Sequence, residues 1–220
     1  MIMTPSPILS QDPFPEVAAS LEEACAPAPR DVGAAVAFAL SRRRRDGDDR
    51  PVLMTAPRAW FVEYGRPYGP GLAGLPLILA PVSNLAEALW AMEQGLRSGA
   101  VSLGLGAVEG ATLAQTRRLD FAARQGEATG LILSRGLEGL SAARRRWRIS
   151  TWASAMDPED ERAPGPPRLH AELTRGRGER PGAWMLEQDD ETHRLRLADR
   201  LADLGPPSIA GTGAPSGLAA

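Results

Sequence analysis

Short apolar runs and amphipathic segments alternate along much of the chain. Four continuous apolar stretches have the length and composition of strands buried on both faces of a parallel sheet, and they span residues 52–56, 76–80, 101–107 and 130–134. Helical patterns lie before and between these runs, at 31–41, 84–98 and 111–125. Helices that alternate with buried strands predict an α/β fold with a mainly parallel sheet flanked by helices.

The helix expected at 84–98 has clear signals at both ends. Asn84 precedes Glu87 by three residues, the spacing of a capping box. Gly99 stands where glycine commonly ends a helix. Between them, one helical face carries the apolar residues Leu85, Leu89, Met92 and Leu96.

The last third of the chain has a different pattern. Polar and apolar residues alternate at 146–154, 168–175 and 182–188, between loops rich in proline and glycine. These segments predict strands that continue the sheet or form its edge, partly antiparallel. Residues 189–204 begin with acidic residues and place Leu197, Leu201 and Leu204 on one stripe, which predicts a C-terminal helix.

These elements predict a single α/β domain at 23–188. Residues 1–22 are expected to be a disordered or poorly packed lead, because the first fifteen residues hold four prolines and little apolar periodicity. Residues 205–220 are rich in glycine, proline, alanine and serine and are expected to form a disordered tail.

The composition limits the chemistry that the chain can perform. All 25 basic residues are arginine, and with 27 acidic residues the net charge is −2. The absence of lysine excludes a lysine Schiff base and a P-loop lysine. Cys25 is the only cysteine, and His170 and His193 are the only histidines, so we expect no disulfide, metal centre or cofactor. No apolar run is long enough for a membrane helix, so we expect a cytoplasmic protein that does not contact membranes.

The loop before the first helix is where a phosphate site would be sought in such a sheet. Residues 24–33 contain neither the glycine pair nor the lysine of a P-loop, and Asp31 would repel a phosphate. Glu109 follows the strand expected at 101–107 and is the one acid there that could hold magnesium. A solvated loop acid is the simpler interpretation, so we expect no nucleotide site.

An ordered series of short motifs between about Arg58 and Glu187 resembles the ImuA family, accessory proteins of damage-induced mutagenesis. The first motifs are Tyr68-Gly69-Pro70-Gly71-Leu72, Glu87-Ala88-Leu89-Trp90-Ala91-Met92-Glu93 and Leu96-Arg97-Ser98-Gly99-Ala100. They continue with Ser141-Ala142-Ala143-Arg144, Arg146-Trp147-Arg148, Pro167-Arg168, Glu172-Leu173, Gly182-Ala183-Trp184 and Leu186-Glu187. The resemblance covers about 130 residues in order.

This resemblance implies a RecA-like, P-loop-type fold with a degenerate nucleotide site and C-terminal edge strands. It also implies a non-catalytic role in SOS mutagenesis, in assembly of an error-prone translesion DNA synthesis complex. The implied partners are an ImuB-like Y-family polymerase homologue and an error-prone C-family polymerase. Two alternatives remain at this stage: a SulA-like cell-division inhibitor, and a divergent RecA-like ATPase that uses Glu109.

Residues 135–148 hold five arginines against one acid, Glu138, with Trp147 among them. The candidate surface for a partner or for single-stranded DNA is Arg144, Arg145, Arg146, Arg148 and Trp152. Guanidinium groups bind phosphate or carboxylate, and tryptophan can stack on an unpaired base. The alternative is that the arginines are solvated and that Trp147 fills the core. A second run, 42–45, is expected to be a solvated helix end.

Overall fold

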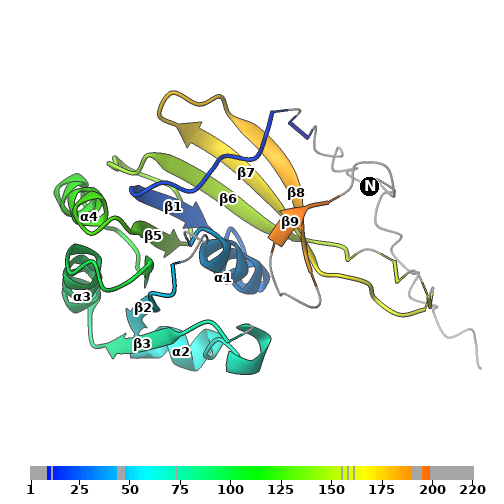
Figure 1. Cartoon of the computed structure of the whole chain (residues 1–220), viewed down its shortest axis with the longest axis horizontal. Coiled ribbons are helices and arrows are strands. Elements are labelled where there is room, and N and C mark those ends of the chain that lie inside the picture. Colours follow the sequence, from blue (N-terminus) through cyan, green and yellow to red (C-terminus); the bar gives the residue numbers. More distant parts are fainter. Residues whose placement is uncertain are drawn as a thin grey trace, which may run out of the picture.

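The computed structural model describes residues 9–10, 12–43, 48–72, 74–154, 156–157, 159–160, 162–189 and 195–198. Within them, one nine-stranded sheet runs in the order β3-β2-β4-β5-β1-β6-β7-β8-β9 (Figure 1). The strands are β1 (Leu21–Cys25), β2 (Val52–Pro57), β3 (Leu77–Val82), β4 (Leu103–Ala107), β5 (Thr129–Ser134), β6 (Arg145–Trp152), β7 (Arg168–Gly176), β8 (Gly182–Gln188) and β9 (Leu195–Leu197).

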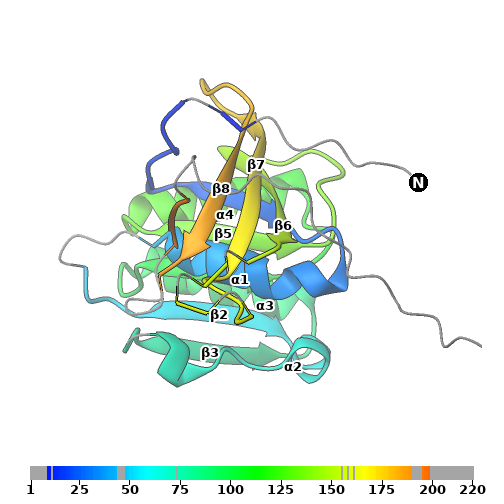
Figure 2. The ribbon, with the colours of Figure 1, turned by 90° about the vertical axis from the view of Figure 1, so that its right-hand side faces the viewer.

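Helices cover both faces of the parallel part of the sheet. They are α1 (Val32–Ser41), α2 (Arg58–Tyr64), α3 (Leu85–Arg97) and α4 (Leu113–Gln125), with 3-10 turns η1 (Pro29–Asp31) and η2 (Gly69–Leu72). On one face, α1 and α2 bury Phe38 and Phe61 in one apolar cluster. On the other, α3 and α4 bury Met92 and Leu119 in a second cluster (Figures 1 and 2). The sheet therefore forms the middle of a three-layer core.

The pairing of the strands confirms the predicted fold class. From β3 to β6 every neighbouring pair is parallel. From β6 to β9 the pairs are antiparallel. The four runs predicted as buried strands form β2 to β5, although β4 begins at Leu103 rather than at residue 101. The alternating segments form β6, β7 and β8, which extend the sheet as expected.

Glycines in β4 determine how closely α3 approaches the sheet. A β-carbon at Gly104 would lie 2.9 Å from Leu96 Cγ, and one at Gly106 would lie 2.9 Å from Met92 Sδ. The apolar face predicted for this helix therefore packs directly on the backbone of β4. The cap at Asn84 also forms as predicted, because its side chain accepts a hydrogen bond from the Glu87 N–H.

The expectation of a poorly packed lead is wrong for the described part of residues 1–22. Leu21 and Glu22 begin β1, which lies between β5 and β6. Before it, Phe14 packs its ring at 5.6 Å from Trp147 and 5.5 Å from Trp184, measured between ring centroids. The Ser10 N–H donates to the Ala183 carbonyl at 2.7 Å. Tertiary contacts hold this segment although its own sequence lacks periodicity.

The predicted C-terminal helix is wrong where the structure can be compared with it. Residues 195–197 form β9, which pairs antiparallel with β8. Pairing with an open sheet edge overrides a short leucine stripe. The rest of that helix beyond residue 198, residues 190–194 and the expected tail at 205–220 lie outside the described residues. Among the helices that are described, none has the length and apolar character needed to cross a membrane.

Candidate functional site

The carboxyl ends of the parallel strands are the usual ligand-binding edge of an open α/β sheet. Here a cavity of about 330 Å³ lies at that edge. Its lining includes Ala26 after β1, Pro57 at the end of β2, Glu109 after β4 and Arg135 after β5. A nucleotide would have to place its phosphates here, against the loop that joins β1 to α1.

The residues of that loop do not fit a nucleotide. Pro27 and Pro29 have no N–H to donate. The Ala28 N–H donates to Asp31 Oδ2 at 3.2 Å, and the Thr151 N–H donates to Asp31 Oδ1 at 2.8 Å. The buried Asp31 carboxylate therefore takes up a backbone donor that a phosphate would need and adds a charge of the same sign.

At this edge Glu109 connects the loop after β4 with the loop after β5. Its Oε1 accepts a hydrogen bond from the Arg135 N–H at 2.7 Å, and Arg135 Nε lies 3.7 Å from the same oxygen. No set of three or more histidine, cysteine, aspartate or glutamate side chains in the described structure is arranged to hold a metal ion. Nearby, burial raises the pKa of the Cys25 thiol, which disfavours a reactive thiolate.

We predict that Mg-ATP does not bind with a dissociation constant tighter than about 100 μM, because the loop lacks donors and carries Asp31. Isothermal titration of the full chain measures this. Tighter binding that disappears in Glu109→Gln would contradict the prediction and support the ATPase alternative.

The arginine cluster is not one exposed surface, because Arg145 and Arg146 are buried. Arg145 binds Glu22 at 3.0 Å and Glu179 at 2.6 Å. Arg146 Nε lies 2.8 Å from Glu23 Oε2. The structure therefore places these two arginines inside ion pairs between β6, β1 and the turn after β7. These ion pairs could not be predicted from the sequence, because the paired acids lie far from the arginines along the chain.

Glu22 is the centre of this buried network. It is fully buried and accepts hydrogen bonds from Arg42 Nη2 at 2.8 Å, Arg145 Nη1 at 3.0 Å and Trp147 Nε1 at 2.8 Å. Burial alone would raise its pKa, but Arg42 and Arg145 together hold the pKa of the carboxyl below its ordinary value. The carboxylate thus remains ionised, and its role is structural.

The prediction of a solvated helix end at 42–45 is wrong for Arg42, which is buried. Its side chain is 2% exposed and donates to the Pro15 carbonyl at 2.7 Å as well as to Glu22. Residues 44 and 45 lie outside the described part. Trp147 fills the core, as the alternative interpretation of the arginine cluster predicts.

Three members of the candidate surface remain accessible. Arg144 and Arg148 have side chains that are 41% and 51% exposed, and each forms an ion pair, with Glu179 and Glu172 respectively. Trp152 is half-buried, with its ring centroid 6.0 Å from that of His170. Arg148 and Trp152 lie on β6, and Arg144 directly precedes this strand.

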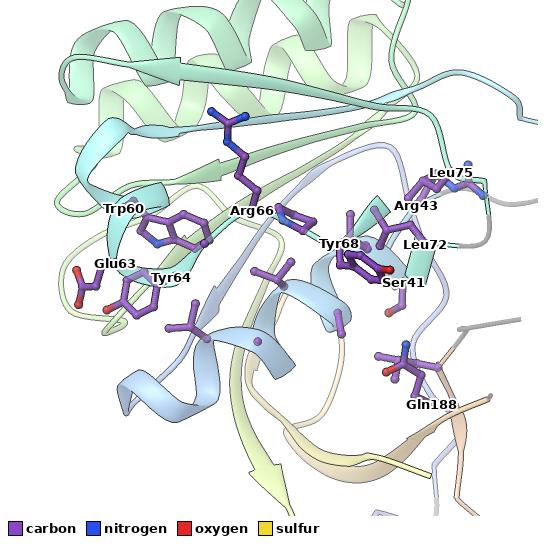
Figure 3. Close-up of a pocket in the computed structure, with 18 of the residues that line it drawn as sticks. Ser41, Arg43, Trp60, Glu63, Tyr64, Arg66, Tyr68, Leu72, Leu75 and Gln188 are labelled. Atoms are coloured by element: carbon purple, nitrogen blue, oxygen red, sulfur yellow. The ribbon is translucent and has the colours of Figure 1, made fainter. Parts of the chain in front are cut away.

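A larger cavity lies between α1 and the segment from α2 to η2 (Figure 3). Its volume is about 620 Å³, and we call it the α1–α2 groove. Val36 and Leu40 line it from α1, and Leu72 lines it from η2. Aromatic side chains from the second wall are Trp60, Tyr64 and Tyr68. The Trp60 ring packs on Tyr64 at 5.2 Å between centroids, so part of this wall is pre-organised.

The chemistry of the groove suits an apolar peptide segment. Charge around the apolar lining comes from Arg43, Arg66 and Glu63. A hydrogen bond to Glu63 raises the pKa of the Tyr64 phenol, which therefore stays neutral at physiological pH. Aromatic and arginine side chains around an apolar centre are typical of protein interfaces.

Only part of the signal for this groove is visible in the amino-acid sequence. Tyr68 and Leu72 belong to the motif Tyr68-Gly69-Pro70-Gly71-Leu72 that carries the family resemblance. The seven-residue helix α2 was not predicted, because prolines and glycines flank its aromatic residues and favour a loop. Without α2, the facing wall could not be placed opposite α1.

Comparison with known proteins identifies related sequences and folds. No family model matches the chain. Protein ImuA of Caulobacter vibrioides, in two strains, is 32% identical over 163 residues, which cover 66% of this chain and 66% of that protein. The chain thus spans about two thirds of the length of these curated relatives.

Among solved structures, the RadB recombinase matches with a TM-score of 0.54 and 10% identity, over 84% of this chain and 93% of RadB. This match shows a RecA-like fold. SulA from Pseudomonas aeruginosa matches with a TM-score of 0.40 and 21% identity, over 52% of this chain and 96% of SulA. That score is too low to establish a shared fold.

Proposed function

Because the chain belongs to the ImuA family, we propose that it is a non-catalytic accessory protein that supports assembly of an error-prone translesion DNA synthesis complex in the SOS response. The partners that we propose are an ImuB-like Y-family polymerase homologue and an error-prone C-family polymerase. The observation that carries this proposal is the contrast between two sites on one RecA-like sheet. At the carboxyl ends of the parallel strands, where a nucleotide would bind, the Asp31 carboxylate takes up backbone donors. The α1–α2 groove, by contrast, is open and has an apolar centre.

The groove is the surface that we assign to the ImuB-like partner. A bound segment would place apolar side chains against Val36, Leu40 and the aromatic wall. An acidic residue in the same segment would meet Arg43 or Arg66. Tyr68 is 75% exposed and belongs to a motif that carries the resemblance to the family, so we take it as the anchor for such a contact.

We predict that Tyr68→Ala weakens binding of a purified ImuB-like partner by about 30-fold or more, the loss expected for an aromatic residue at the centre of an interface. Co-precipitation followed by surface plasmon resonance measures the change. The fold should be retained because the side chain is largely exposed.

Val62→Ala is the matched control. Val62 lies on α2 and is 86% exposed, but it does not line the groove. Its substitution should leave partner binding unchanged. An equal loss in both variants would show that the groove is not the interface, and no capture by the wild-type chain would refute the proposed function.

A further inference from the structure

A second accessible surface lies across the sheet from the α1–α2 groove, on the outer sides of α3 and α4 (Figure 1). Two large aromatic side chains point into solvent there: Trp90 is 62% exposed and Phe121 is 63% exposed. We call this the α3–α4 face, and it comprises Trp90, Arg97, Arg117, Arg118, Phe121 and Arg124. Neither the buried network nor the groove uses any of these residues.

An ion-pair bridge fixes how the two helices present this face. Glu93 on α3 binds Arg97 at 2.6 Å and Arg118 of α4 at 2.5 Å. Trp90 stands three residues before Glu93, and Phe121 stands three residues after Arg118. Residues three apart are neighbours on a helix surface, so Trp90 lies one turn from Glu93 on α3 and Phe121 lies one turn from Arg118 on α4. The face thus carries both rings and the bridging arginines on two adjacent helices.

The charge of this face differs from that of the whole chain. Every exposed charged side chain of α4 is an arginine. The side chains of Arg97, Arg118 and Arg124 are 40%, 64% and 53% exposed. The carboxylates that pair with them, Glu93 and Asp120, are only 6% and 14% exposed. Solvent therefore meets positive charge here although the chain carries a net charge of −2.

Glu87 is an exposed acid that borders the face and is already engaged. Glu87 stands one turn before Trp90 on α3. Its carboxylate accepts hydrogen bonds from the Ser83 N–H at 2.8 Å and from Asn84 Nδ2 at 3.1 Å. This carboxylate caps the helix and is turned toward its N-terminus.

We propose that the α3–α4 face binds single-stranded DNA, with bases stacked on Trp90 and Phe121 and phosphates held by the arginines between and beside them. A single strand offers unpaired bases that can stack on the exposed rings and phosphates that can pair with the exposed guanidinium groups of this face. A duplex hides its base faces, so it is a poor match. The choice of DNA over RNA rests on the proposed function.

The test uses the full chain and fluorescence anisotropy of a labelled oligo(dT). Trp90→Ala and Phe121→Ala are each expected to weaken binding by about 5- to 150-fold, the range for loss of one stacked base. Arg117→Gln should reduce the slope of log affinity against log salt by about 0.7 if it removes one phosphate contact. Thermal melting checks that each variant remains folded.

Tyr68→Ala is the matched control on the opposite side of the sheet. It should leave oligo(dT) binding unchanged, while Trp90→Ala should leave capture of the ImuB-like partner unchanged. The proposals for DNA binding at the α3–α4 face and for partner binding at the α1–α2 groove can therefore be refuted independently.

Three results would overturn the proposal. The first is an absence of wild-type binding to oligo(dT) at physiological salt. The second is DNA binding that neither aromatic substitution weakens; if Trp90→Ala then loses partner capture, the face is a protein interface instead. The third is equally tight binding to oligo(U), which would remove the preference for DNA.

Discussion

Glu22→Gln is expected to lower the free energy of unfolding by about 3–5 kcal/mol, the cost of removing one partner from a buried ion pair. The substitution preserves the shape of the side chain but leaves the guanidinium groups of Arg42 and Arg145 without their shared carboxylate. Both arginines lie inside the domain, where water cannot replace the lost charge. Chemical denaturation of the purified variant measures the change.

Glu172→Gln is the control for the same chemical change at an exposed pair. Glu172 binds Arg148 at 3.1 Å, with side chains that are 38% and 51% exposed. Exposed pairs contribute little, so the free energy of unfolding should change by no more than about 1 kcal/mol. Similar losses of unfolding free energy in the two variants would show that the burial of Glu22 does not determine the size of the effect.

The effect of Glu22→Gln should also depend on pH. The folded-state pKa of Glu22 lies below the ordinary value of 4.5, so its ion pairs contribute fully above that pH. The contribution is lost as the pH falls through the folded-state pKa. The difference in unfolding free energy between wild type and variant should therefore shrink in acid, and a constant difference would contradict the assignment.

Phe14→Ala is expected to lower the free energy of unfolding by about 3 kcal/mol, the low end for a phenylalanine because the ring is only partly covered. The ring packs edge-on against Phe38 and Trp184 and also contacts Trp147. Denaturation of the full chain measures this loss. The result would establish that the folded domain begins before β1.

Phe121→Ala provides the same chemical change at an exposed position. Phe121 is 63% exposed on α4, so its removal should alter the unfolding free energy by no more than about 0.5 kcal/mol. If the unfolding curve of Phe14→Ala matches that of the wild type, the N-terminal segment adds nothing to stability.

The parallel core could be predicted because its signal is local. Val52 to Ala56 and Thr129 to Leu133 are buried on both faces, so their own composition reveals them. β1 could not be predicted in this way, since its sequence Leu-Glu-Glu-Ala-Cys places two acids in a completely buried strand. Their burial makes sense only with Arg42, Arg145 and Arg146 beside them, and sequence spacing does not bring these residues together.

The candidate sites show the same limit. The missing phosphate loop was evident from residue types alone, because lysine is absent and Asp31 is present. The arginine cluster was misplaced because a run of arginines has the same composition whether it faces solvent or pairs with buried acids. Burial and partners, which separate the two cases, depend on how β6 lies against β1.

The position of β1 also sets an order for assembly during synthesis. Glu22 and Arg145 are 123 residues apart, and both neighbours of β1 come from the later part of the chain. At about 5–20 residues per second, translation leaves β1 without its β6 neighbour for roughly 6–25 s. Strands β2, β3 and β4 can pair with one another in that interval, and β5, the other neighbour of β4, is also made before β6. Until Arg145 and Arg146 are made, Glu22 and Glu23 add charge to the nascent segment, a feature that opposes premature association of an unpaired strand.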